Sequence, residues 1–253
     1  FMPNGIEGVG ASAAIVFFSY IGLDAIVGAS EEVKNPSRNI PLAIVIALII
    51  VTSVYILVAV SSLGAQVVSD FTGQEAGLAI ILEGVTGGSW SAALMSVGAV
   101  ISVFSVTLVA IFGQTRVCFA MSRDGLLPKL FSKIHFNSGV PRAGTLTSAL
   151  LITPLAGLLP SHLLWGMVSM GTLVAFSAVA MSLMILRHKY PEPIKGFQVP
   201  LYPITPILSI LACGYLIYSL TQTVYITFGI WVAIAAVLYL IQGIRHSKLA
   251  RLN

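Results

Sequence analysis

The chain has very little charge. Asp, Glu, Lys and Arg make up 9% of its 253 residues, whereas soluble domains carry about 25%. Apolar residues make up 57% of the chain, and the mean hydropathy is +0.97. These values exclude a soluble domain and predict an integral membrane protein. Long apolar segments between short polar ones favour helices over the weak ten-residue alternation of a membrane barrel.

Cysteine and histidine are scarce as well. Cys118 and Cys213 fall in separate apolar segments, so we predict reduced packing residues without a disulfide or metal site. The four histidines fall in loops or at the ends of apolar segments, and no pattern resembles a catalytic triad. We therefore predict a protein that is not an enzyme and holds no cofactor. The basic residues lie in loops, which is a poor pattern for nucleic-acid binding.

Seven apolar segments predict transmembrane helices, for each of which about 20 residues are needed. A shorter apolar stretch, Ala76–Val85, predicts an interfacial or re-entrant helix. The loop at 124–141 predicts a short amphipathic helix, and Asn39 is predicted to cap the second span. The seven spans lie at about 11–33, 40–64, 90–121, 143–159, 163–187, 203–220 and 223–244.

Positive charge is missing from every second loop. All 13 Lys and Arg residues lie at or beyond the ends of the first, third, fifth and seventh spans. The other loops, 66–88, 160–162 and 221–222, contain none. The positive-inside rule then predicts that the N-terminus lies outside and the C-terminus lies in the cytoplasm.

The first span contains a glycine and a carboxylate inside its apolar run. Asp24 lies roughly 10 Å from the cytoplasmic end of that run. A charge at such a depth costs at least about 2.5 to 3.5 kcal/mol, so it must face protein or water. We predict a discontinuous helix, opened near Gly22, whose backbone groups hold a polar ligand. The alternative is an ordinary span with a glycine packing notch and a neutral or paired Asp24.

Two carboxylates end the same span. Glu31 and Glu32 lie where the helix dipole disfavours anions, so they need a cation. Lys34, Arg38 or an arginine after the third span, such as Arg116, could supply it. The pairing is either interfacial anchoring or an inner gate that forms in one state and breaks in another.

Seven spans with an outside N-terminus are also the layout of rhodopsins and seven-helix receptors. A retinal protein needs a lysine inside a span, and no span interior here has one. The receptor signatures after the third helix and in the seventh are absent too. Both classes are therefore disfavoured.

Several separated strings resemble the amino acid–polyamine–organocation superfamily. Tyr20–Asp24 followed by Glu31–Pro36 resembles its sixth helix. Gly113–Arg116 with Ala120–Pro128 resembles the end of its eighth helix and the following loop. The cationic amino acid transporter branch gives the best match. Further agreement comes from Val140-Pro141, Gly171–Leu173 and Phe197–Pro200.

The resemblance implies an all-α membrane fold built from an inverted five-plus-five helix repeat followed by two further helices. Residues 1–187 would form the second repeat, and residues 188–253 the two additional helices and a cytoplasmic tail. The first repeat, the N-terminal half of such a transporter, would be missing. It would be this chain's partner in the substrate site.

The resemblance also implies a substrate site at the broken helix. In the family, backbone carbonyls there bind the α-amino group of the substrate, and the matching positions are Phe18, Ser19 and Ile21. Tyr20 and Gly22 belong to the same stretch. Unwound backbone leaves acceptors that hydrocarbon does not satisfy but an ammonium group does.

Other positions complete the implied site. Leu23 stands where the family usually has a gating aromatic residue, so Tyr20 or Phe18 would have to act as the lid. Asp24 would have a structural or proton-linked role. Ser102 and Ser105 share one face of the third span. Their hydroxyls either bond their own helix or line the site opposite the break.

The function implied by the resemblance is secondary active transport of amino acids across the plasma membrane by alternating access. Protons are preferred over sodium as the coupling ion. Cationic and neutral amino acids both remain open as substrates. The alternative is a non-transporting membrane fragment or accessory subunit that associates with a partner chain.

Overall fold

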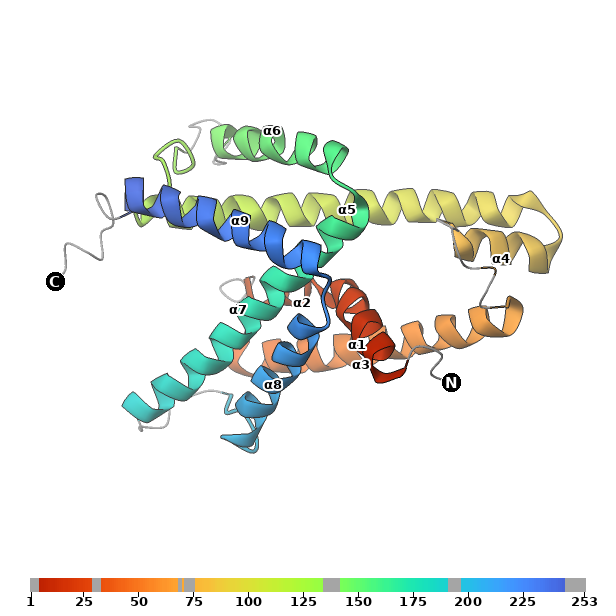
Figure 1. Ribbon diagram of the computed structural model, residues 1–253, viewed down its shortest axis with the longest axis horizontal. Coiled ribbons are helices and arrows are strands. Elements are labelled where there is room, and N and C mark those ends of the chain that lie inside the picture. Colours follow the sequence, from red (N-terminus) through yellow and green to blue (C-terminus); the bar gives the residue numbers. More distant parts are fainter. Residues whose placement is uncertain are drawn as a thin grey trace.

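The computed structural model describes residues 5–28, 33–67, 70, 76–133, 142–190 and 197–243. Within these ranges the chain forms helices joined by turns, with no strand (Figure 1). The predicted all-helical membrane class is therefore confirmed. The helical elements are α1 (Gly5–Val16), η1 (Phe17–Tyr20), α2 (Leu23–Gly28), α3 (Pro36–Ala65), α4 (Gly77–Thr86), α5 (Ser89–Arg123), α6 (Arg142–Leu158), α7 (Ser161–Lys189), α8 (Ile204–Tyr218), α9 (Gln222–Leu238) and the π-helical η4 (Tyr239–Gly243).

Four described helices are long and apolar enough to cross a membrane: α3, α5, α7 and the segment Gln222–Ile241. The predicted count of seven spans is not confirmed. The first apolar segment is interrupted, α6 has 17 residues, and α8 has 15. The orientation of the termini stays a prediction. The short helix expected within 66–88 is present as α4.

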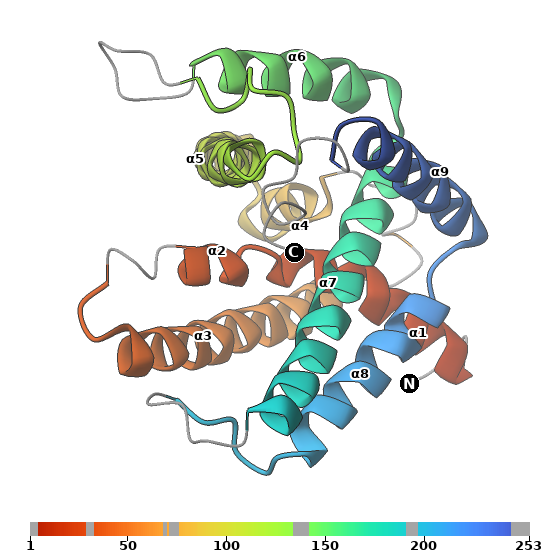
Figure 2. The same cartoon turned by 90° about the vertical axis from the view of Figure 1, so that its left-hand side faces the viewer.

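The helices form two groups. Figures 1 and 2 show that α4 turns back along the first half of α5, while α6 lies along its second half. In the other group, α8 lies beside α7, α9 packs against α7, and α1 contacts both α7 and α8. α3 contacts α4 and therefore belongs with the first group. The first segment connects the two groups, because α2 packs against α3 whereas α1 packs against α7 and α8.

The buried core belongs to the second group. It joins Ala14 of α1 to Leu163 and Met170 of α7, to Leu220 in the turn before α9, and to Val224 of α9. Elsewhere most large apolar side chains are exposed, and α3 has no buried residue. Such faces match lipid tails, which are as apolar as the side chains themselves.

The predicted cap of the second span is wrong. α3 begins at Pro36, three residues before Asn39, and Asn35 takes the N-cap position with φ of 50°. Asn39 instead donates from Nδ2 to the Lys34 carbonyl at 2.6 Å. Proline suits the first turn of a helix because its missing N–H has no intrahelical partner there.

The amphipathic helix predicted at 124–141 is also wrong over its described part, because residues 124–133 form turns. The Ser122 hydroxyl donates to the Pro128 carbonyl at 2.7 Å, which folds the chain back on the end of α5. Phe131 then packs on α6, where a Cβ at Gly144 would lie 3.4 Å from it. Side-chain bonds to the backbone compete with helix formation in this way.

Candidate functional site

The first helix is interrupted between Tyr20 and Leu23. Ile21 is extended, with φ of −69° and ψ of 135°, and Gly22 has φ of +118°. Residues with a Cβ avoid this value of φ. No heavy atom lies within 4 Å of the place where a Cβ on Gly22 would stand. The backbone conformation, and not a lack of space, therefore requires glycine. The interruption lies where the sequence predicted one.

On one side, the interrupted segment is attached to α3. The Tyr55 hydroxyl donates to the Ser19 carbonyl at 3.0 Å. The hydroxyls of Tyr20 and Thr52 lie 3.3 Å apart. The rings of Tyr20 and Tyr55 meet edge to face, with centroids 5.5 Å apart. These contacts attach η1 to α3 at the point where the first helix is interrupted.

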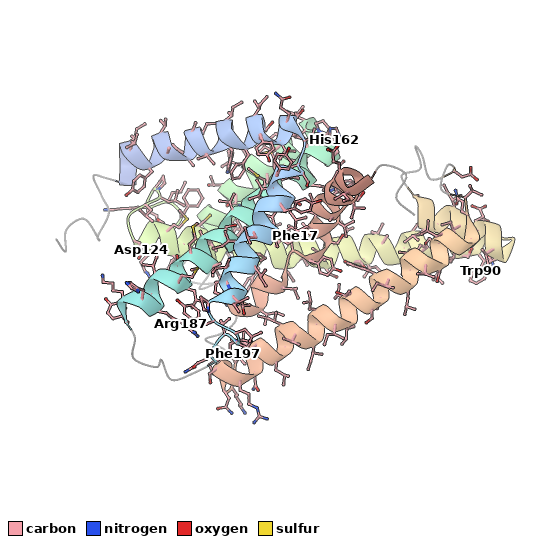
Figure 3. The ribbon with its side chains drawn as sticks, turned by 60° about the horizontal axis from the view of Figure 1, so that its bottom comes forward. Phe17, Trp90, Asp124, His162, Arg187 and Phe197 are labelled. Atoms are coloured by element: carbon pink, nitrogen blue, oxygen red, sulfur yellow. The ribbon has the colours of Figure 1, made fainter. Side chains whose placement is uncertain are left out.

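On the other side, two adjacent phenylalanines attach the segment to α7. Phe17 meets Phe176 edge to face at 6.1 Å between centroids. Phe18 meets Trp165 at 6.3 Å, with the rings tilted by 36°. Figure 3 labels Phe17 near the centre of the molecule. Because η1 contacts both α3 and α7, it lies between the two groups of helices.

The structure brings the predicted residues of the first segment together. Phe18, Ser19, Tyr20 and Ile21 lie at the interruption, and the Phe18 carbonyl accepts the Ile21 N–H at 3.1 Å. Leu23 starts α2 and is partly buried. Asp24 is the second residue of α2, and its side chain lies outside the described part of the structure.

The structure does not gather the predicted serines of α5 around the interruption. α5 packs mainly against α4 and α6. The Ser105 hydroxyl donates to the Ile101 carbonyl at 2.9 Å, as hydroxyls in apolar helices commonly do. Ser102 lines a cavity of about 390 Å³ between α4 and α5, together with Leu82, Ser91, Leu94, Met95, Gly98 and Ala99.

The described residues do not test the predicted inner gate or its alternative, interfacial anchoring. The Arg116 guanidinium lies over the ring of Phe112, 4.3 Å from its centroid, a cation–π contact. Glu31 and Glu32 lie outside the described residues. Their pairing with a cation stays a prediction.

Sequence reasoning missed the residues that hold the interrupted segment in place. Thr52 and Tyr55 are three residues apart on α3, and Trp165 and Phe176 are eleven apart on α7. Both spacings place their members on one helical face. The spacing shows that each pair shares a helical face. It does not show that this face meets the interrupted segment, which is more than 30 residues away along the chain.

A family model described as "Amino acid permease" matches residues 1–223. The chain belongs to the amino acid permease family. The chain is 39% identical over 250 residues to the methylthioribose transporter of Bacillus subtilis (strain 168), covering 98% of this chain and 54% of that protein. It is 37% identical over 249 residues to the branched-chain amino acid permease BcaP of the same organism, covering 98% and 53%.

A third relative is the human cationic amino acid transporter 4, which is 36% identical over 193 residues, covering 76% of this chain and 30% of that protein. The predicted resemblance to cationic amino acid transporters is thus confirmed. The chain spans about half the length of the two Bacillus relatives. All three relatives are named as transporters or permeases, which supports a protein that is not an enzyme.

Proposed function

We propose that this protein transports amino acids across the plasma membrane by alternating access, with the interrupted helix as part of its substrate site. The observation that carries this proposal is the interruption at Ile21 and Gly22 in a member of an amino acid permease family. Carbonyls and amides there have left regular helical pairing. Within the membrane, such groups can hold a substrate's ammonium and carboxylate.

The carbonyls of Phe18 and Ser19 retain the capacity to bind a substrate. Among the described residues, the Phe18 carbonyl accepts a hydrogen bond from the Ile21 N–H, and the Ser19 carbonyl accepts one from the Tyr55 hydroxyl. A carbonyl oxygen has two lone pairs, so an ammonium group can donate to the second. This is the role that we propose for them.

The side chains around η1 favour a neutral, apolar substrate over a cationic one. Its described partners on α3 and α7 are aromatic or carry a hydroxyl: Thr52, Tyr55, Trp165 and Phe176. None carries the negative charge that a guanidinium or a second ammonium would need. We therefore propose a substrate class like that in the name of the branched-chain permease.

The proposal predicts leucine exchange by the purified protein in proteoliposomes. Vesicles loaded with unlabelled leucine should accumulate external radiolabelled leucine, and excess valine should compete with it. Arginine and methylthioribose should compete less. Vesicles without protein are the control. Absence of exchange with neutral and cationic amino acids alike would favour the non-transporting alternative.

Asp24 is proposed to couple transport to protons. Asp24→Asn should abolish leucine accumulation driven by an imposed proton gradient, because an amide cannot take up and release a proton in the physiological range. Leucine counterflow, which needs no net proton movement, should continue. Both activities are measured in one vesicle preparation. Accumulation that remains driven by the gradient would contradict the role of Asp24.

A further inference from the structure

One hydroxyl group inside α7 lacks a hydrogen bond. Ser169 is 0% exposed, and its Oγ has no partner among the described residues. Other hydroxyls of the same helix avoid this state by donating to the carbonyl four residues earlier, as Thr172 does to Val168 and Ser177 to Leu173. A buried polar group without a partner is destabilising and calls for a physical reason.

Along α7, Ser169 lies between the two residues that contact η1. Phe18 contacts α7 at Trp165, and Phe17 contacts it at Phe176. These contacts are about 16 Å apart along the helix axis, from a rise of about 1.5 Å per residue. Residues 165, 169, 173 and 176 share one helical face. Ser169 is therefore between the two aromatic contacts, on the face of α7 that meets η1. Figure 2 shows α7 passing close to the first helical segment.

We propose that the two aromatic pairs form a reversible clamp between η1 and α7, and that Ser169 is the positioning residue that favours its opening. This proposal rests on the transport function proposed above. With the clamp closed, the Ser169 hydroxyl has no partner. When η1 moves along α7, the hydroxyl donates to a backbone carbonyl of η1, whose second lone pair can accept it.

The consequence is a bias between two conformations. The aromatic contacts favour the closed clamp, and the buried hydroxyl disfavours it. A state stabilised too strongly would stop alternating access, because transport requires both conformations to be populated. Ser169 thus keeps the closed clamp from becoming the only populated state.

Kinetics of leucine exchange test the role of the hydroxyl. Ser169→Ala keeps the packing and removes the hydroxyl, so it should favour the closed clamp and lower the maximal exchange rate about tenfold, with a smaller change in KM. The maximal exchange rate of Ser169→Cys should lie between those of wild type and Ser169→Ala, because a thiol is a weak hydrogen-bond donor. Ser177→Ala removes a hydroxyl bonded within its own helix and should stay within about twofold of wild type. Wild-type exchange by Ser169→Ala would overturn the proposal.

Thiol labelling tests the clamp without transport. Ser169→Cys is made in a Cys118→Ser, Cys213→Ser background, and its reaction with N-ethylmaleimide is followed in membranes. Trp165→Ala, which removes one aromatic contact, should speed the reaction about tenfold as the closed state loses stability. Trp231→Ala, on α9 and 55% exposed, should not. No acceleration by Trp165→Ala would overturn the clamp. Failure of the proposed function would instead appear as absent leucine exchange by the wild-type protein.

Discussion

Replacing Gly22 with alanine is expected to lower leucine exchange by roughly 10- to 100-fold, from a backbone strain of about 1–3 kcal/mol. The φ of +118° at this residue is one that side chains with a Cβ avoid. Nothing stands within 4 Å of the missing Cβ, so a steric clash does not contribute. The loss would therefore report on the backbone conformation of the interruption itself. Exchange in proteoliposomes, normalised to the amount of folded protein, measures it.

Two further glycine variants make the result specific. Gly64→Ala places a methyl group in equally open space on α3, where the glycine is helical, and should leave exchange unchanged. Gly22→Asn should lose about as much activity as Gly22→Ala, because asparagine tolerates the left-handed region near φ of about +57° and not a φ of +118°. Full activity of Gly22→Ala would mean that the helix does not need its interruption for transport.

The interruption could be predicted because its cause is local. Gly22 and Asp24 stand inside an apolar run in which a continuous helix would put a carboxylate into hydrocarbon. The observed chain leaves the helix after Tyr20 and resumes it at Leu23. Hydropathy also located the long helices well, since α5 and α7 end within two residues of the predicted limits.

The contacts of the interrupted segment could not be predicted in the same way. Tyr55 donates to the Ser19 carbonyl from 36 residues along the chain, and Phe17 meets Phe176 across a still longer separation. Hydrophobic periodicity reports which face of a helix is apolar, and in a membrane helix nearly every face is. The expected placement of Ser102 opposite the interruption had no local support either, and Ser102 instead lines the cavity shared with α4.

The 124–133 segment shows a different limit. Its leucines have helical spacing, but Ser122 bonds the Pro128 carbonyl and the chain turns. Spacing measures amphipathicity and does not measure the competing bonds of a single hydroxyl. The serine and the proline were visible in the sequence, whereas their pairing became clear only in the fold.

The second large effect is expected where α9 crosses α7. Gly166 of α7 is buried against Val224 of α9, which is 4% exposed, and a Cβ on Gly166 would overlap Cγ2 of Val224. Both residues belong to the region of the buried core formed by α1, α7, α8 and α9. Gly166→Ala should therefore lower the free energy of unfolding by about 1–3 kcal/mol through overpacking.

The measurement is the temperature at which the purified protein in detergent loses its monodisperse state. The double variant Gly166→Ala, Val224→Ala should recover much of the loss, because shortening the valine makes room for the new methyl group. Residues in direct contact show this kind of non-additivity, whereas the effects of independent sites simply add.

Gly214→Ala, on α8 with open space around it, is the matched control, and its stability should stay near that of wild type. If the double variant were no more stable than Gly166→Ala, close contact between α7 and α9 would not be the cause. Recovery of stability by the double variant would show that α9 packs closely against α7 because residue 166 is a glycine.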